Sequence, residues 1–275
     1  MVQDQSYYKN GFNKAISDTH ASRTVSNSAG FVIPILEPNH KLLDVGCGPG
    51  SITLDFANYV EGGEIIGVEP TEELIDLANE NKAKLAAQGK KVDNVKFQIG
   101  SIYQLPFEDN SFDVVYAHQV VIHLEDPIAG LKELKRVTKP NGFVCVRDAD
   151  LESTTIFPQK YEDTLRFWFT SKAAKSTDTR AGRSLKSKAI KAGYISENIK
   201  ASAWIWCVSD AAARAFSAKG SINRIQNSGE NLKVGDEETN KKKKQEIIQA
   251  WTEFADDEEG YFTMQGGEIV YQKEA

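Results

Sequence analysis

The chain has 275 residues with a formal net charge of −6, and 40% of its residues are hydrophobic and 26% charged. This composition predicts a globular protein, and the acidic balance argues against a general nucleic-acid binder. No apolar stretch reaches the ~18 residues of a membrane-spanning helix, and the polar start lacks the pattern of a signal peptide. The three cysteines lie far apart, and no CxxC or HxxxH spacing occurs, which favours a reduced, metal-free, cytoplasmic protein.

The first half of the chain alternates between predicted strands and helices. An N-terminal helix is expected at about 22–36, where Val25, Ala29 and Val32 recur at helical spacing before Pro38. Strands are then predicted at about 41–45, 64–68, 95–99, 111–117 and 143–146. Helices are predicted between them at about 51–60, 71–87 and 127–138. Helices of this length between strands favour right-handed crossovers and a parallel sheet covered on both faces.

The last third of the chain follows a different pattern. It reads as an irregular stretch, then a helix, a strand, two helices and a final strand, at about 151–183, 184–192, 199–207, 209–226, 237–255 and 261–272. We expect the last two strands to form an antiparallel pair. The chain is predicted to be one domain over residues 1–275, with a helical cap (1–38), a cofactor-binding half (40–150) and an acceptor-side cap with the C-terminal strands (151–275).

The segment Leu42–Gly50 is the most informative part of the sequence, because an apolar run ends there in three closely spaced glycines. This pattern predicts a buried strand that turns tightly beneath a ligand. The second predicted strand is followed by Glu69, where a carboxylate can accept hydrogen bonds from a ribose. A nicotinamide dehydrogenase is disfavoured, because its fingerprint requires a glycine where this chain has Ser51.

Five segments match one family in order and spacing over about residues 40–146: Leu42–Gly50, Gly67–Glu69, Leu105–Phe107, Ser111–Val115 and Leu134–Gly142. Together they resemble the class I S-adenosylmethionine-dependent methyltransferases, in particular the small-molecule group that includes quinone-biosynthesis methyltransferases. The resemblance implies an α/β Rossmann-like fold with S-adenosylmethionine as cofactor. Its sheet would have seven mostly parallel strands with an antiparallel last strand, helices on both faces, an N-terminal helix and an inserted cap.

The resemblance also implies a set of cofactor-binding residues. The glycines would pass under the methionine part, Asp44 would organise their loop, and Glu69 would accept hydrogen bonds from both ribose hydroxyls. Where relatives have Gly-Asp, this chain has Gly100-Ser101-Ile102, so we expect Ser101 to reach the adenine amino group and Ile102 to pack on the ring. The complete predicted set is Arg23, as a lid contact, with Asp44, Gly46, Cys47, Gly48, Gly50, Glu69, Pro70, Ser101, Ile102 and His118.

Candidates for the acceptor side follow the fourth and fifth predicted strands. His118 and His123 are candidate proton acceptors, with packing, cofactor contact or capping as the alternative roles. Arg147–Asp150 either orients an acceptor or forms ion pairs within itself. The later aromatic residues either line an apolar acceptor pocket or belong to a core: Phe157, Tyr161, Phe167, Trp168, Phe169, Trp204 and Trp206.

The leading functional prediction is methyl transfer to a small-molecule acceptor by in-line displacement. One alternative is an RNA or protein methyltransferase that uses the basic stretch 172–200, which carries eight lysines and arginines between Lys172 and Lys200 against Asp178 and Glu197. Another is a cofactor-binding module without catalytic activity. The sequence predicts neither the acceptor atom nor the oligomeric state.

Overall fold

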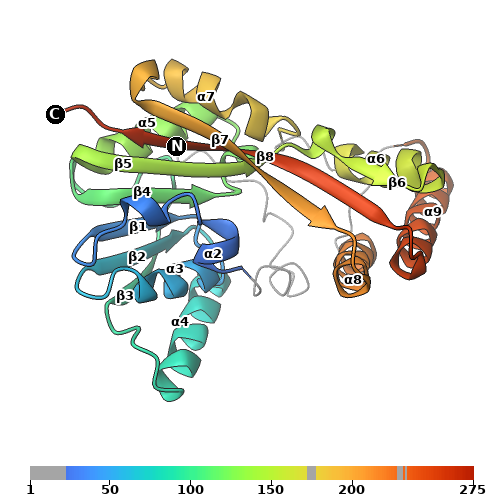
Figure 1. Cartoon of the computed structure of the whole chain (residues 1–275), viewed down its shortest axis with the longest axis horizontal. Helices are drawn as coiled ribbons and strands as arrows, with labels where there is room; N and C mark the ends of the chain where they lie inside the picture. The colour runs from blue at the N-terminus through green and yellow to red at the C-terminus, as the bar shows by residue number, and fades with distance from the viewer. Residues whose placement is uncertain (1–22, 172–177, 228–231, 233) are drawn as a thin grey trace.

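A single mixed β-sheet organises the molecule (Figure 1). The computed structural model describes residues 23–171, 178–227, 232 and 234–275. Within them the sheet has eight strands in the order β3-β2-β1-β4-β5-β8-β6, and β7 also pairs with β8. The strands are β1 Lys41–Val45, β2 Glu64–Glu69, β3 Val95–Ile99, β4 Phe112–His118, β5 Thr138–Ala149, β6 Thr155–Phe157, β7 Ile199–Val208 and β8 Tyr261–Gln272.

The first five strands pair in parallel. The last strand, β8, runs antiparallel to β5, β6 and β7. The expected mostly parallel sheet with an antiparallel C-terminal strand is therefore confirmed. The expected number of seven strands is wrong, because the three-residue strand β6 adds to the sheet within a stretch that was predicted to be irregular.

Helices cover both faces of the sheet (Figure 1). The α-helices are α2 Val25–Ser28, α3 Ser51–Asp55, α4 Glu72–Ala87, α5 Pro127–Val137, α6 Glu162–Ser171, α7 Ala181–Lys191, α8 Ala211–Asn227 and α9 Glu237–Asp256. Short 3-10 helices are η2 Ile33–Ile35, η3 Phe56–Asn58, η4 Val121–His123, η5 Leu151–Ser153, η6 Gln159–Tyr161 and η7 Ser196–Asn198. No helix of the described residues is long and apolar enough to cross a bilayer.

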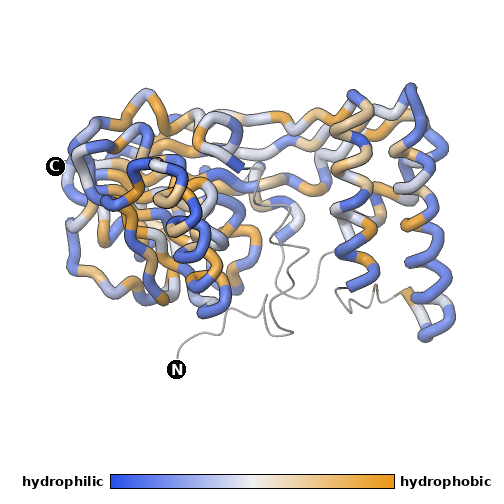
Figure 2. The backbone as a smooth tube through the Cα atoms, turned by 90° about the horizontal axis from the view of Figure 1, so that it is seen from below, coloured by the Kyte–Doolittle hydropathy of each residue, from blue (hydrophilic) through white to orange (hydrophobic). Residues whose placement is uncertain are grey.

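The alternation of side chains along the strands divides the body into two hydrophobic cores. Leu42 and Val114 belong to the core shared with α2 and α3. Their neighbours Leu43 and Val115 belong to the core under α5 and α7. Because successive strand residues point to opposite faces, one apolar run serves both layers. Figure 2 shows hydrophobic segments inside the body of the molecule.

The third hydrophobic core lies in a cap at the far end of β7 and β8. There α6, α8 and α9 pack together around fully buried side chains that include Trp168, Trp251 and Phe254. Figures 1 and 2 show this cap beside the body, joined to it by the long β7–β8 ribbon. Burial of several aromatic side chains supplies enough apolar area to hold this helical layer on the ribbon.

Three expectations about secondary structure are wrong. The helix predicted at 22–36 is a four-residue helix followed by η2, because Pro34 lies at the start of η2 and cannot extend a preceding helix. The stretch 151–183 is not irregular throughout, since it contains β6 and α6. Strand β5 continues to Ala149, so Arg147 and Asp148 belong to the strand and not to a loop after it. Residues 1–22 lie outside the described residues.

Candidate functional site

All three glycines of the loop that follows β1 have positive φ angles, of 75° at Gly46, 52° at Gly48 and 78° at Gly50. This backbone conformation favours glycine at each of these positions. A Cβ atom at Gly46 would lie 2.4 Å from Val120 Cγ2, and one at Gly50 would lie 2.6 Å from Phe97 Cζ. At Gly48, in contrast, an added Cβ would meet nothing within 4 Å. Side chains therefore pack against both ends of the loop, whereas no protein atom lies close to its centre at Gly48.

Glu69 ends β2 directly beside this loop. Its side chain is 4% exposed, and the amide of Gly48 donates a hydrogen bond to Oε2 at 3.2 Å. The other oxygen, Oε1, is buried and has no hydrogen-bond partner in the described part of the chain. Burial raises the pKa of Glu69, although Thr71 and the Gly48 amide oppose the shift. A buried acceptor without a donor is costly, so Oε1 is an acceptor that a bound hydroxyl can satisfy.

Asp44 stabilises the loop from inside the protein. The Thr53 hydroxyl donates a 2.6 Å hydrogen bond to Oδ2 of Asp44, which links the end of β1 to α3. Burial raises the pKa of Asp44 to about 7, with Thr53 lowering it and the charge of Glu69 raising it. The amides of Gly46 and Cys47 both donate to the carbonyl of Val68, at 2.7 and 3.1 Å. The loop is thus held in place by protein groups before any ligand binds.

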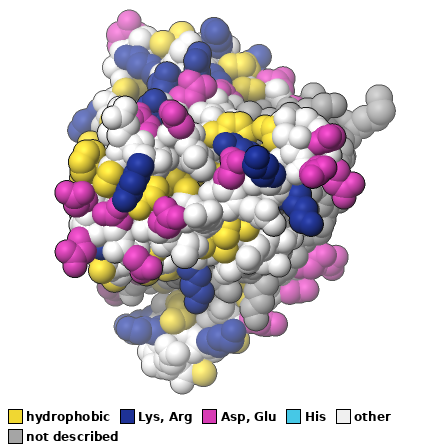
Figure 3. Space-filling model, turned by 90° about the vertical axis from the view of Figure 1, so that its right-hand side faces the viewer, with side chains coloured by type: hydrophobic (Ala, Val, Ile, Leu, Met, Phe, Trp, Pro, Cys, Tyr) yellow, Lys and Arg dark blue, Asp and Glu magenta, His cyan; other side chains and the backbone are white. Residues whose placement is uncertain are grey.

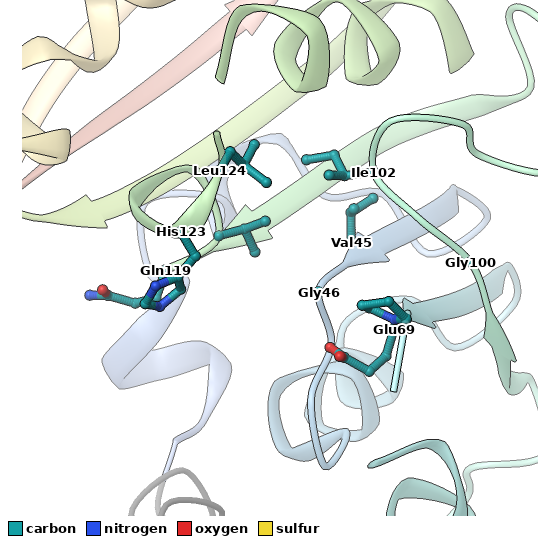
Figure 4. A pocket seen from close by; sticks show the side chains of 10 residues that line it. Val45, Gly46, Glu69, Gly100, Ile102, Gln119, His123 and Leu124 are labelled. Atoms are coloured by element: carbon teal, nitrogen blue, oxygen red, sulfur yellow. The ribbon is translucent and has the colours of Figure 1, made fainter. Parts of the chain in front are cut away.

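These elements enclose a pocket at the carboxyl ends of the strands. Its lining residues are Val45, Gly46, Glu69, Pro70, Gly100, Ile102, Gln119, Val120, His123 and Leu124. Figure 4 shows the apolar side chains of Val45, Ile102 and Leu124 gathered on one side, with Glu69 across the pocket from His123 and Gln119. A pocket with an apolar wall and a carboxylate at its edge has the chemistry to hold a nucleoside, with the base on the wall and the ribose at Glu69.

A second cavity of about 370 Å³ adjoins this pocket. Gln119 lines both spaces, and it has an unusual backbone conformation with a φ of 58°. Strained backbone of this kind is frequent at functional sites. Arg23, His118 and Arg147 line the cavity together with residues of β7 and α8. The two spaces therefore meet at the residue that follows β4.

His118 is the last residue of β4, and its Nδ1 is buried without a hydrogen-bond partner among the described residues. Burial lowers its pKa well below the ordinary value, and the nearby Arg23 and Arg147 lower it further. The imidazole is therefore neutral at pH 7 and retains a lone pair. His123, on η4, instead lines the first pocket. His123 therefore lines the first pocket, and His118 lines the second cavity.

Of the two alternatives for Arg147–Asp150, ion pairing within the segment is wrong. Arg147 and Asp148 do not pair with each other, because successive residues of β5 point to opposite faces of the sheet. The Arg147 guanidinium binds Glu268 on β8, with Nε 2.8 Å from Oε1. Asp148 accepts hydrogen bonds from the amides of Val121 and Ile122, at 3.2 and 3.3 Å. Arg147 lines the second cavity, whereas Asp148 supports η4.

The predicted site residues thus fall into three groups. The first pocket brings together Gly46, Glu69, Pro70, Ile102 and His123, while Arg23 and His118 line the second cavity. Asp44, Cys47, Gly48 and Gly50 lie in or beneath the glycine loop and do not line either space. Ser101 does not line the pocket, and its hydroxyl accepts a 3.2 Å hydrogen bond from the amide of Tyr103.

Sequence reasoning missed Gln119 and Arg224. Gln119 carries no motif, and its role follows from its position between two spaces. Arg224 lies on α8, far from the glycine loop in sequence. Of the aromatic candidates, Phe169, Trp204 and Trp206 line the second cavity. Trp168 and Tyr161 are buried in the core of the cap, and Phe157 is 53% exposed.

The fold is that of a class I methyltransferase. The methyltransferase domain family matches residues 36–204 of the chain. An uncharacterized methyltransferase of Schizosaccharomyces pombe is 44% identical over 273 residues, which cover 98% of each chain. Demethylmenaquinone methyltransferase of Staphylococcus aureus strain MRSA252 is 34% identical over 122 residues, 44% of this chain and 48% of that protein.

Solved structures agree on the fold. The structure of the YcgJ protein of Bacillus subtilis has a TM-score of 0.57 at 19% identity, covering 91% of this chain and 100% of that one. The chain belongs to the methyltransferase domain family and is a class I S-adenosylmethionine-dependent methyltransferase. The unpartnered Oε1 of Glu69 and the open centre of the glycine loop at Gly48 fit this cofactor.

Proposed function

We propose that the protein transfers a methyl group from S-adenosylmethionine to a small molecule bound in the second cavity. The observation that carries this proposal is that the two spaces meet at Gln119. The cofactor supplies a methyl group that is already activated on a sulfonium. The chain therefore has to hold an acceptor in line with it and exclude water. A partly enclosed cavity next to the nucleoside pocket can do both.

Within this proposal the residues make different contacts with the cofactor. Glu69 binds both ribose hydroxyls, and Ile102 packs against the adenine. Gly46, Cys47, Gly48 and Gly50 form the loop beneath the methionine part, which Asp44 stabilises through Thr53. Pro70 closes the ribose side of the pocket. Arg23 binds the cofactor carboxylate from the cavity side, as its position in the lining allows.

His118 is the proposed proton acceptor. The acceptor's lone pair forms the new bond to the methyl carbon, and the carbon–sulfur bond breaks with its electron pair left on sulfur. The proton lost by the acceptor passes to the neutral imidazole, whose Nδ1 has no hydrogen-bond partner among described residues. His123 lines the nucleoside pocket, so a proton-transfer role for it is disfavoured by its position.

The alternative of an RNA or protein substrate finds little support in the basic stretch 172–200. Lys172 and Lys175 lie outside the described residues. Three of the remaining cations form ion pairs with carboxylates of the same chain: Arg180 with Glu152, Arg183 with Asp150 and Lys188 with Asp178. On the face at the cap end, Figure 3 shows basic side chains interspersed with acidic ones. Neither the ion-paired cations of the stretch 172–200 nor the mixed charges at the cap end form the continuous basic surface that a nucleic acid requires.

Calorimetric titration with S-adenosylmethionine, S-adenosylhomocysteine and NAD tests the cofactor assignment. We expect the first two to bind and NAD not to bind. Glu69→Ala removes two charge-assisted hydrogen bonds to the ribose, so we expect about 100-fold weaker binding or more. Glu73→Ala, which removes an exposed carboxylate from α4, is the matched control. Unchanged affinity of the Glu69 variant would contradict its role, and absence of binding by both adenosyl ligands would overturn the proposal.

We also propose a cytoplasmic location. Cys47, Cys145 and Cys207 are all free thiols in the structure, which suits a reducing compartment. Fractionation of cells expressing the tagged protein tests this, and recovery in an oxidising compartment would contradict it.

A further inference from the structure

One buried carboxyl on β5, that of Asp148, holds the segment 119–123, which follows β4 and contains η4. Part of this segment lines the first pocket. Oδ2 of Asp148 accepts a hydrogen bond from the amide of Val121 at 3.2 Å, and Oδ1 accepts one from the amide of Ile122 at 3.3 Å. Asp148 itself lines neither the first pocket nor the second cavity. It therefore acts on the first pocket through the backbone of η4.

Two backbone hydrogen bonds hold the same segment 119–123 from either side. The amide of Gln119 donates to the carbonyl of Arg147, on β5, at 2.8 Å. The amide of Asp178, three residues before α7, donates to the carbonyl of Ile122 at 2.8 Å. These bonds place the segment between β5 and the start of α7, and the buried carboxyl adds two more.

The supported segment shapes the first pocket. Val120 packs on the glycine loop so closely that a Cβ atom at Gly46 would lie 2.4 Å from its Cγ2. Gln119 has a φ of 58°, a left-handed conformation that persists only where the surrounding structure enforces it. Figure 4 shows Gln119 and His123 close together, across the pocket from Glu69. A displacement of η4 would therefore change the pocket in which we place the nucleoside.

Several groups set the charge state of Asp148. Burial has the largest effect and raises its pKa to about 8, against the two amides of η4. The charge of Lys188, on α7, also lowers the pKa, whereas that of Asp178 raises it, and these two side chains form an ion pair. On the neighbouring elements, β8 places Gly267 opposite Asp148, and η4 contributes His123, which lines the first pocket. The carboxyl therefore titrates near pH 8.

We propose that Asp148 is a positioning residue for the cofactor: its carboxylate fixes η4 and Gln119 at the pocket, so that the cofactor binds more tightly when this carboxyl is ionised. The inference rests on the proposed function, since it concerns the cofactor bound in the first pocket. Asp148 touches neither the cofactor nor the acceptor in this role. It determines how firmly the backbone that lines the pocket is held.

The physical reason lies in the two hydrogen bonds. A carboxylate offers acceptor lone pairs at both oxygens, whereas a protonated carboxyl carries a hydrogen on one of them. Hydrogen bonds to an ionised group are also the stronger ones, so loss of the proton tightens both contacts with η4. Because linkage is reciprocal, a ligand that requires η4 to be fixed lowers the pKa of Asp148, and its binding releases protons.

Calorimetric titration with S-adenosylhomocysteine as a function of pH tests the proposal. The quantity to compare is the ratio of the affinities of wild type and Asp148→Asn, because Asp44 and Glu69, whose pKa values are also raised, titrate in both proteins. A charge-assisted hydrogen bond in place of a neutral one corresponds to about 5-fold tighter binding. Most of this gain in the ratio should appear between about pH 7 and about pH 9, around the pKa of Asp148.

A second measurement needs no substitution at Asp148. The NMR signal of its carboxyl carbon reports its pKa in the wild-type protein, and this pKa should fall when S-adenosylhomocysteine saturates the site. Lys188→Gln removes a charge that favours the ionised form and lines neither space, so the midpoint should move to higher pH. Asp163→Asn, at an exposed position on α6, is the control and should keep the wild-type profile.

The possible outcomes separate the positioning role from the proposed function. An affinity ratio that is equal at both ends of the pH range, or a pKa of Asp148 that the ligand leaves unchanged, means that Asp148 supports only the fold. A midpoint that Lys188→Gln does not move assigns the titration to another group. Each of these results overturns the positioning role while S-adenosylhomocysteine still binds. Absence of binding by the wild-type protein at every pH overturns the proposed function instead.

Discussion

Asp148 is a fully buried carboxyl whose protonation should control how stability depends on pH. It lies on β5 beneath η4 and accepts hydrogen bonds from the amides of Val121 and Ile122. Burial raises its pKa from 3.8 to about 8, although the two amides and the charge of Lys188 oppose the shift, and Asp178 adds to it. Folding therefore favours the protonated form. Asp148→Asn replaces the carboxyl with a neutral group of similar shape at every pH.

The direction of the effect follows from the number of bound protons. Between the unfolded and folded pKa values the native state binds a proton that the unfolded state has lost, so the free energy of unfolding falls as pH rises. The loss is about 1 kcal/mol for each pH unit. Between about pH 5.5 and about pH 7.5 the wild-type protein should thus lose about 2 kcal/mol that Asp148→Asn retains.

Urea unfolding followed by tryptophan fluorescence measures this difference, because Trp168 and Trp251 are buried in the cap. The quantity to compare is the change with pH in each protein, which cancels any constant effect of the substitution. Asp163→Asn, at an exposed position on α6, is the control. Parallel pH curves for wild type and Asp148→Asn would refute the reasoning, because they would mean that the buried group is ionised throughout.

Two further substitutions test the buried polar groups. Glu268→Gln leaves the Arg147 charge buried without its carboxylate, so urea unfolding should show a loss of about 3 kcal/mol. Replacing both residues with methionine should recover much of that loss, and failure of either result would count against a buried ion pair. Thr53→Val removes the 2.6 Å hydrogen bond to Asp44 and should cost about 1 to 3 kcal/mol. The cost should be larger above pH 7, because Thr53 stabilises the ionised carboxyl; a cost that is equal at all pH values would contradict this.

The strands of the first half could be predicted closely because their signal is local. The predicted ranges 41–45 and 95–99 agree with β1 and β3. β1 is a short apolar run that is buried on both faces of the sheet, whereas β3 is an alternating run at the edge of the sheet. The glycine loop could be predicted for the same reason, since only glycine satisfies its positive φ angles and close contacts.

The errors arose where a long-range contact or a single residue overrides the local pattern. Val25, Ala29 and Val32 are fully buried, as their spacing predicted, yet Pro34 prevents the continuous helix. In α6, Leu165 and Trp168 have helical spacing, but the aromatic residues around them gave a general apolar signal without a clear period. Only the packing of α6 against α9 shows which of these residues belong to the core.

The site residues show the same contrast between those that a local pattern predicts and those that depend on the folded chain. Gly46, Glu69 and Ile102 were predicted because each belongs to a motif with fixed spacing, and the structure places them around one pocket. Gln119 and Arg224 have no such spacing. Their positions depend on how β4 ends and on how the cap lies against the body, and both are properties of the folded chain. A sequence pattern can therefore indicate the cofactor half of the site more readily than the acceptor half.

The register of β5 determines which charged residue lines the second cavity. His118, Arg147, Glu268 and Ser202 form one row across four adjacent strands, and the Ser202 hydroxyl donates to Glu268 at 2.8 Å. A shift of β5 by one residue would place Asp148 in this row and remove the guanidinium from the cavity.

The register is fixed at the start of the strand. Thr138 pairs with Phe112, but Phe143 pairs with Val114, so residues 139–142 form an irregularity opposite Asp113. A Cβ atom at Gly142 would lie 2.8 Å from the carbonyl oxygen of Asp113, and Lys139 binds the carboxylate of the same aspartate at 2.8 Å. The turn that begins β5 therefore determines which of two opposite charges faces the second cavity at the other end of the strand.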